Sequence, residues 1–215
     1  MAEGNSPPDR SPRPTTNRYV ALEGIDGAGK TRLVKELARL LAEDGQEVEI
    51  VREPGGTAVG EGLRKVLLDG SSVSPWAEAY LFAAARAQLV DEVVRPALRK
   101  GAWVLSDRSV YSSLAYQGAG RGLGIEEVKR INQPGLEGTW PALVILLDLD
   151  PRTGLIRQAQ PDRIGSMGTS FLAAVAEGYR HLARQEPHRF VEIDAGHPLE
   201  EVISSAWQSI RAVQK

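Results

Sequence analysis

Short apolar runs and longer amphipathic stretches alternate along most of the chain. The runs have the length of buried strands, and a segment of helical length separates each from the next. They occupy residues 18–23, 47–52, 102–106, 142–148 and 189–193. Strands that alternate with helices are typical of a parallel sheet, because a crossover helix returns the chain to the starting edge. The pattern therefore predicts an α/β fold with a five-stranded parallel sheet flanked by helices.

Two of the intervening segments carry clear helix signals. Residues 31–44 place an apolar stripe on one face, made of Leu33, Leu37, Leu40 and Leu41. A second helix is predicted over 75–100, since a serine cap and a first-turn proline precede it. This helix carries Phe82 and Arg86 four residues apart, and hence on one face.

A glycine-rich loop with the pattern G-x-x-x-x-G-K-[ST] lies between the first strand and the first helix. Its residues are Gly24, Ile25, Asp26, Gly27, Ala28, Gly29, Lys30 and Thr31. The glycines let several backbone N–H groups converge on phosphate oxygens, Lys30 adds a positive charge, and Thr31 offers a hydroxyl to a magnesium ion. The strand before the loop and the helix after it disfavour a purely structural glycine turn. The loop predicts a triphosphate site within a three-layer P-loop NTPase fold.

The composition is that of an ordinary globular domain. The 215 residues carry a net charge of −2 and no cysteine, so nothing favours binding to nucleic acid, a disulfide framework or thiol chemistry. Residues 1–17 are rich in proline and lack an apolar stretch, which predicts a disordered tail before a single domain over 18–215. No apolar run is long enough to span a membrane. We expect a cytoplasmic protein.

Other positions narrow the reaction that a phosphate loop alone leaves open. A GTPase of the common type needs Asn-Lys-x-Asp, and no asparagine of the chain precedes a lysine. Asp107 and Arg108 follow the third predicted strand, and a parallel sheet places them at its carboxyl edge beside the phosphate loop. There an acid can hold magnesium-bound water and an arginine can hold a second phosphate. Taken alone, the two residues could instead form an exposed ion pair in a turn.

With these residues in place, the chain resembles the thymidylate kinase family over about residues 18–212. Enzymes of this family pass the γ-phosphoryl group of ATP to dTMP. The resemblance is carried by the segments 22–31 (LEGIDGAGKT), 52–57 (REPGGT), 81–88 (LFAAARAQ) and 107–118 (DRSVYSSLAYQG). It implies ATP and Mg²⁺ as cofactors, small-molecule nucleotides as partners, and a homodimer formed through helices on one face of the sheet.

The resemblance also implies roles at the acceptor end. In the family, arginines matching Arg52 and Arg108 gather the monophosphate, for which guanidinium groups are well shaped. Glu53 would precede the family's cis-proline corner, which holds Arg52 inward. Phe82 would stack on the pyrimidine ring, and Arg86 would donate to a ring carbonyl. Without the resemblance, Phe82 would be interpreted as core packing.

Further matched positions concern the sugar and the metal. The family uses the loop aspartate near the 3′-hydroxyl, which implies that role for Asp26. Ser113, Tyr116 and Gln117 would line the base and sugar, with the tyrosine ring excluding a 2′-hydroxyl by its bulk. The alternative for these three residues is an ordinary amphipathic helix face. Thr31 and Asp107 would serve the magnesium ion.

Residues 151–168 suit a flap better than a core element, because they are rich in Arg, Gln, Gly and Pro and lack an apolar stripe. Ala28 occupies a loop position at which some family members carry an arginine, so the charge must come from elsewhere. Arg163, with Arg157 beside the ATP, matches the flap arginines of members that close over the nucleotide. The predicted catalytic residues are Lys30, Asp107, Arg108 and Arg163.

Several positions depart from the usual family pattern. Charged residues are common where this chain has Gly165, Ala85, Ala142 and Ala176, and Arg32 replaces a common threonine. Three functions therefore stay open: a dTMP kinase, a kinase for another 5-substituted dUMP analogue, and a catalytically weakened nucleotide-binding regulatory protein. The retained phosphate-handling residues argue against the third, since a protein that only binds nucleotide has little use for a clamp on both phosphates.

Overall fold

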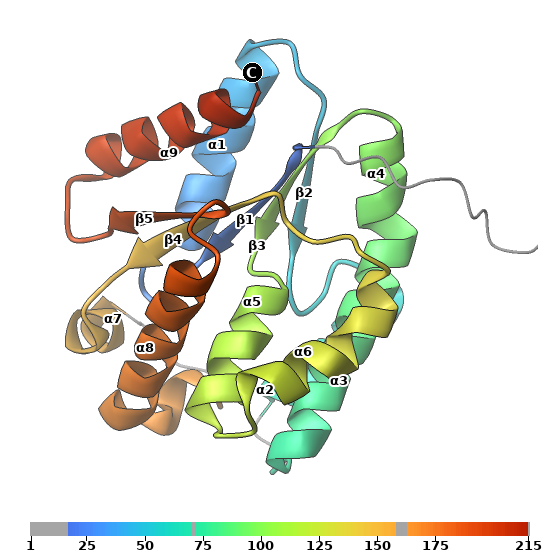
Figure 1. The fold of residues 1–215 in the computed structure, drawn as a ribbon, viewed down its shortest axis with the longest axis vertical. Coiled ribbons are helices and arrows are strands. Elements are labelled where there is room, and N and C mark those ends of the chain that lie inside the picture. Colours follow the sequence, from blue (N-terminus) through green and yellow to red (C-terminus); the bar gives the residue numbers. More distant parts are fainter. Residues whose placement is uncertain (1–16, 70–71, 158–162, 215) are drawn as a thin grey trace, which may run out of the picture.

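The sheet is parallel throughout and has the strand order β2-β3-β1-β4-β5 (Figure 1). The computed structural model describes residues 17–69, 72–157 and 163–214. Its strands are β1 (Tyr19–Glu23), β2 (Val48–Arg52), β3 (Trp103–Asp107), β4 (Leu143–Asp148) and β5 (Phe190–Asp194). Each strand begins one residue after the start of its predicted apolar run. The predicted five-stranded parallel sheet is confirmed, whereas the predicted tail, apart from residue 17, lies outside the described residues.

Helices follow each strand and cover both faces of the sheet. They are α1 (Lys30–Glu43), α2 (Ala58–Leu68), α3 (Pro75–Leu89), α4 (Arg95–Arg99), α5 (Val110–Ser113), α6 (Ile125–Leu136), α7 (Pro151–Arg157), α8 (Thr169–Gln185) and α9 (Leu199–Val213). A π-helical turn, Val90–Val94, joins α3 to α4, and a second, Leu114–Gly120, extends α5. A short 3₁₀ turn, Gly165–Met167, precedes α8. Within the described ranges, no helix is both long enough and apolar enough to cross a membrane.

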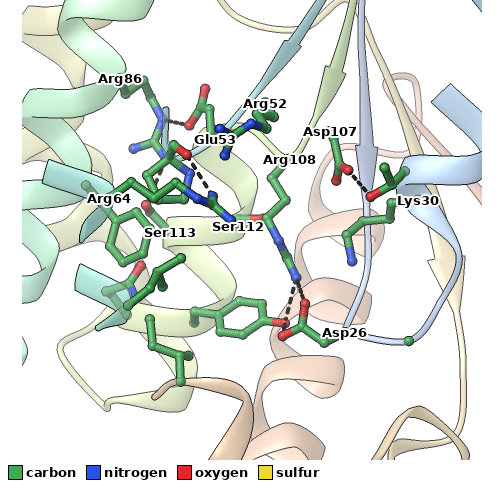
Figure 2. A pocket seen from close by; sticks show the side chains of 18 of the residues that line it. Asp26, Lys30, Arg52, Glu53, Arg64, Arg86, Asp107, Arg108, Ser112 and Ser113 are labelled. Atoms are coloured by element: carbon green, nitrogen blue, oxygen red, sulfur yellow. Dashed lines mark hydrogen bonds and ion pairs between the residues drawn. The ribbon is translucent and has the colours of Figure 1, made fainter. Parts of the chain in front are cut away.

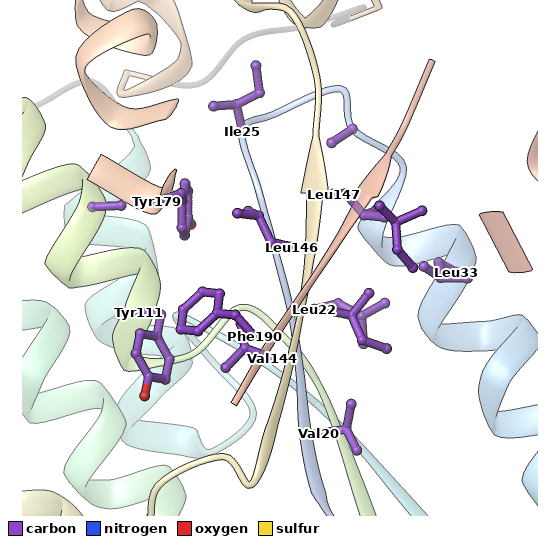
Figure 3. Close-up of a cluster of buried hydrophobic side chains, with 14 of the residues drawn as sticks. Val20, Leu22, Ile25, Leu33, Tyr111, Val144, Leu146, Leu147, Tyr179 and Phe190 are labelled. Atoms are coloured by element: carbon purple, nitrogen blue, oxygen red, sulfur yellow. The ribbon is translucent and has the colours of Figure 1, made fainter. Parts of the chain in front are cut away.

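The central strands send alternate side chains to two helical layers, as the period of a strand requires. Val20 and Leu22 of β1 point toward α1, whereas Tyr111 and Phe190 pack on the opposite face (Figure 3). On the first face α1 packs against α9, and on the second α8 packs against the π-helical turn after α5. Glu23, which follows Leu22 in the strand, therefore faces the second layer.

The stripe predicted for the first helix forms part of the core. Leu33, Leu37 and Leu41 of α1 are fully buried, and Leu40 is half-buried. The helix is amphipathic, so burial of this stripe against the sheet fixes its rotation about its own axis. The short loop after β1 places the first turn of α1 at the carboxyl ends of β1 and β3, where the predicted site residues gather.

Candidate active site

The phosphate loop connects the carboxyl end of β1 to α1. Gly24, Gly27 and Gly29 have φ values of 134°, 84° and 94°, a region in which side chains are strained. The Lys30 ammonium donates to the carbonyl oxygens of Gly24 at 3.1 Å and Ile25 at 2.9 Å. The loop is thus folded around a buried positive charge at the start of a helix.

The first turn of α1 is open to an anion. Its N-terminal cap is Gly29, which has no side chain to accept from the backbone N–H groups of that turn. Such N–H groups and the helix dipole favour a phosphate at this position. Burial and the nearby charge of Arg108 lower the pKa of Lys30 to about 8, although the carboxylates of Asp26 and Asp107 act in the opposite direction. A phosphate would relieve both effects.

The two predicted metal residues lie together. The Thr31 hydroxyl donates to the Asp107 carboxylate, because Asp107 ends β3 directly beside Leu22 of β1. In the described part of the chain, no three His, Cys, Asp or Glu side chains gather in a way that could hold a metal ion. A cation here would take most of its ligands from phosphate and water, which suits Mg²⁺ and its hard oxygen ligands.

Arg108 lies between the loop and the rest of the pocket. It has φ of 74°, uncommon for a residue with a side chain, and its guanidinium forms an ion pair with Asp26. The same group donates to the hydroxyls of Ser112 at 3.1 Å and Tyr116 at 3.3 Å. Burial by itself would raise the pKa of Asp26, but the charges of Arg108 and Lys30 outweigh it and hold the pKa below its ordinary value.

The far end of the pocket is built around Arg86 of α3, whose side chain is only 2% exposed. The guanidinium donates to Glu53 at 2.7 Å, to the Ser109 carbonyl at 3.2 Å and to the Ser113 hydroxyl at 3.0 Å. Its fourth partner is the side-chain oxygen of Asn132. Burial raises the pKa of Glu53 in spite of the arginine beside it. The peptide bond before Pro54 is cis, as the resemblance implied.

All these groups open into one cavity of about 900 Å³. Most predicted site residues line it: Asp26, Gly27, Gly29, Lys30, Thr31, Arg52, Glu53, Phe82, Arg86, Asp107, Arg108, Ser113, Tyr116, Gln117 and Arg157. Figure 2 shows Lys30 and Asp107 at one end, Arg86 and Glu53 at the other, and Arg108 between them. Gly24, Ile25 and Ala28 of the loop do not line the cavity, although the first two hold Lys30.

The comparisons with known proteins agree with this geometry. A family model described as thymidylate kinase matches residues 22–206. The chain belongs to the thymidylate kinase family. It is 44% identical over 196 residues to the thymidylate kinase of Deinococcus radiodurans, which covers 89% of this chain and 95% of that protein. The enzyme of that name from Staphylococcus epidermidis is 39% identical over 89% of this chain and 96% of its own length. The thymidylate kinase of Synechococcus sp. is 42% identical over 90% of this chain and 95% of its own length.

Two arginines that the thymidylate kinase resemblance assigned to phosphates are engaged elsewhere. Arg52 lines the cavity, but its guanidinium donates to both carboxylate oxygens of Glu61, at 2.8 and 2.9 Å, and its side chain is 47% exposed. It is therefore not held inward as expected. Arg163 does not line the cavity; it donates to the Leu67 carbonyl at 2.9 Å and to Glu78 at 2.7 Å. Arg163 cannot reach a nucleotide unless these contacts break.

The first part of the predicted flap is ordered against the phosphate loop. Residues 151–157 form α7, and a Cβ on Gly154 would lie 2.8 Å from the Asp26 carbonyl oxygen. Arg157, at the end of α7, lines the cavity and donates to the Ala195 carbonyl at 3.1 Å. The prediction of a flap rather than a core element is therefore incomplete for residues 151–157, which pack against the phosphate loop. Residues 158–162 of the flap lie outside the described residues.

Several residues of the site were missed by sequence reasoning, and three of them show why. Arg64 of α2 lines the cavity and donates to the Pro54 carbonyl at 2.8 Å. Asn132 of α6 orients Arg86, and the fully buried Glu78 of α3 accepts from Gln117 at 2.9 Å. Each is a polar residue within a helix, and the sequence offered no spacing or motif that sets it apart from a solvated face.

Two of the departures from the family pattern lie in the core. Ala85 and Ala176 are 2% and 4% exposed, and Ala176 belongs to the main cluster of buried apolar side chains. Gly165 is also buried, in the 3₁₀ turn before α8. None of these three residues lines the cavity.

Proposed function

We propose that this member of the thymidylate kinase family transfers the γ-phosphoryl group of ATP to dTMP, which yields ADP and dTDP. One observation carries the proposal: a single cavity has a triphosphate loop at one end, a buried arginine suited to reading a base at the other, and Arg108 between them. The thymidylate kinase name of the relatives supports the same reaction.

The donor end fits ATP with Mg²⁺. Lys30 and the first turn of α1 would bind the β- and γ-phosphates. The Thr31 hydroxyl and the Asp107 carboxylate would hold the Mg²⁺ ion, directly or through its water ligands. When bound, Mg²⁺ neutralises charge that develops on the phosphate oxygens. Arg157 lies where it can face the nucleotide from α7.

The acceptor end fits a pyrimidine. A guanidinium has five N–H groups, and the four described partners of Arg86 leave one on Nη1. That N–H can donate to a ring carbonyl, while Phe82 offers a face for stacking. Because burial and four partners fix the guanidinium, it recognises an acceptor at one position only.

Transfer needs no general base, because the phosphate of dTMP is already ionised near neutral pH. The residues bind and orient: Arg108 would hold the acceptor phosphate in line with the γ-phosphate, and charge stabilisation provides the rate. Among the residues that the structure describes, the second oxygen of Asp26 accepts one long contact, of 3.4 Å, from Tyr116. We propose that it accepts the 3′-hydroxyl of the sugar.

The flap arginine would join the site only after a movement. Arg163 would leave Glu78 and turn toward the phosphates when ATP binds, and Arg52 would likewise exchange Glu61 for the acceptor phosphate. Both exchanges replace a carboxylate by a phosphate of higher charge, which favours the guanidinium contact. Arg163 then supplies the charge that Ala28 does not.

We propose a homodimer formed through α2 and α3. Val59 and Val66 of α2 are 52% and 49% exposed, and Trp76 and Tyr80 of α3 are 41% and 57% exposed. Pairs spaced by seven and by four residues share a helix face, and α2 packs against α3, so we propose that the four side chains contribute to one apolar surface. A second copy would bury it. Tyr80→Arg should give monomers in analytical ultracentrifugation, and Ile50→Arg, at an exposed apolar site on β2, should leave the dimer intact.

ADP formation with a panel of nucleoside monophosphates tests the reaction. We expect dTMP to stimulate ADP formation more than dUMP or 5-hydroxymethyl-dUMP. Faster turnover of either analogue would show that the enzyme prefers a different 5-substituent on the pyrimidine. If ATP binds but no monophosphate stimulates ADP formation, the result would favour a nucleotide-binding regulatory protein. The cytoplasmic location stays a prediction.

A further inference from the structure

Glu23 is a buried carboxylate to which the reaction gives no role. It ends β1, is completely inaccessible to solvent, and faces the layer of α5 and α8. One of its oxygens accepts from the Ser109 backbone N–H at 2.7 Å and the Ser109 hydroxyl at 2.6 Å. The other accepts from the Ser112 hydroxyl at 2.6 Å and the Tyr179 hydroxyl at 2.8 Å. Each oxygen thus receives two donors, as a buried carboxylate requires.

The protons on these hydroxyls determine what they can offer to Arg108. A hydroxyl has one proton. The Ser112 and Tyr179 hydroxyls each lie within hydrogen-bond distance of Glu23 and 2.9 Å from one another, so each donates either to Glu23 or to the other hydroxyl, and neither proton is directed at Arg108. Their lone pairs are left to accept from Nη1 of Arg108, at 3.1 Å from Ser112 and 3.5 Å from Tyr179. Glu23 therefore turns two hydroxyls into oriented acceptors for a guanidinium that it does not touch.

Glu23 also holds the backbone around Arg108. The left-handed conformation of Arg108 is fixed on one side by its N–H, which donates to the Leu22 carbonyl at 3.0 Å. On the other side, the next N–H, that of Ser109, donates to the Glu23 carboxylate. The same carboxylate therefore restrains both the backbone and the side chain of Arg108.

We propose that Glu23 is a positioning residue for the acceptor phosphate, which acts through the hydroxyls of Ser112 and Tyr179 to aim Arg108. This inference rests on the proposed role of Arg108 in binding that phosphate. The chemistry requires a carboxylate. A glutamine at position 23 would place its NH₂ group on one of the two sides. On one side the NH₂ would face the Ser109 N–H, so that two donors oppose each other; on the other it would donate to the two hydroxyls, whose protons would then point at Arg108.

The test compares the affinities of the Glu23→Gln variant for dTMP and for thymidine, which lacks the phosphate. Because Arg108 would contact only the phosphate, loss of positioning should weaken dTMP alone, whereas a distorted pocket should weaken both ligands. We expect the Kd for dTMP to rise about 10- to 100-fold, the range for loss of hydrogen bonds that involve a charged group. The Kd for thymidine, measured by the same calorimetry, should stay as in the unaltered protein. Equal weakening of both ligands, or no change in either, would overturn the inference.

Two further arms keep the test decisive. The double variant Ser112→Ala/Tyr179→Phe removes both oriented hydroxyls with little change in volume, and it should show the same phosphate-specific loss if Glu23→Gln fails to fold. In that background, adding Glu23→Gln should weaken dTMP binding less than it does alone; a fully additive loss would contradict action through the hydroxyls. If Arg108→Ala leaves the ratio of the dTMP and thymidine affinities unchanged, the proposed role of Arg108 itself fails. A change with Arg108→Ala but none with Glu23→Gln refutes only the positioning role.

Discussion

Lys30 should take up a proton when ATP binds. In the structure its ammonium is buried beside Arg108, and these two effects lower its pKa to about 8. Triphosphate oxygens at the open first turn of α1 would place negative charge beside Nζ and restore the pKa to its ordinary value or above. The uptake is therefore measured as ATP binds with Mg²⁺ in the absence of dTMP, so that no phosphoryl group is transferred.

The size of the uptake follows from the pKa. At about pH 8.5, a group of pKa about 8 is roughly one quarter protonated, so full protonation on binding takes up about 0.75 of a proton. At about pH 7 the group is already about 90% protonated, and the uptake falls to about 0.1. Other groups near the loop do not interfere: the pKa of Asp26 is lowered and that of Tyr116 is raised beyond this range. ATP itself is fully ionised at the higher pH.

Isothermal titration calorimetry in two buffers of different ionisation enthalpy measures this uptake. The observed enthalpy should depend on the buffer at the higher pH and hardly at all at the lower one. Lys30→Arg is the matched control, since it keeps a positive charge that does not titrate. Uptake that is equal at both pH values, or that persists in Lys30→Arg, would refute the assignment of the buried ammonium to the triphosphate.

Three further predictions concern the packing around the site. Arg86→Met should lower the free energy of unfolding by about 3 kcal/mol in denaturant titrations, because it leaves Glu53 buried without its partner; unchanged stability would contradict a paired role. Gly154→Ala should raise the Kd for ATP about tenfold, because the added methyl group would press on the phosphate loop. Gly62→Ala has open space around it and should instead raise the free energy of unfolding by about 0.5–1 kcal/mol. Burial would raise the pKa of Glu78, but its hydrogen bonds lower it on balance, so stability should fall as pH drops below about 4.5; this loss should flatten in Glu78→Gln.

The sequence predicted the sheet and the phosphate loop because both depend on short-range patterns. Apolar runs of strand length located the five strands to within a residue of their first positions, and the spacing of glycines around Lys30 defined the loop. Asp107 and Arg108 could be placed beside that loop, since the carboxyl ends of parallel strands share one edge.

Contacts between distant helices could not be predicted in the same way. Arg86 is held by Asn132 and Ser113, which lie in other helices, and Glu78 joins the base side of the cavity to the flap through Gln117 and Arg163. Each of these pairs depends on how the helices pack, for which the chain carries no local signal.

Arg52 shows a second limit of sequence reasoning. The motif that contains it identifies a residue able to bind phosphate, but in the structure the same guanidinium donates to Glu61. A pattern records the chemistry that a residue can perform. The partner that it holds before the substrate arrives depends on tertiary structure.

Transfer of labelled phosphate from γ-labelled ATP tests the account most directly. The unaltered protein should move the label to dTMP and form labelled dTDP, while Arg108→Ala should lose this transfer and still bind ATP. Label that appears only as inorganic phosphate, or equal transfer by both proteins, would contradict an acceptor phosphate held by Arg108 against the phosphate loop.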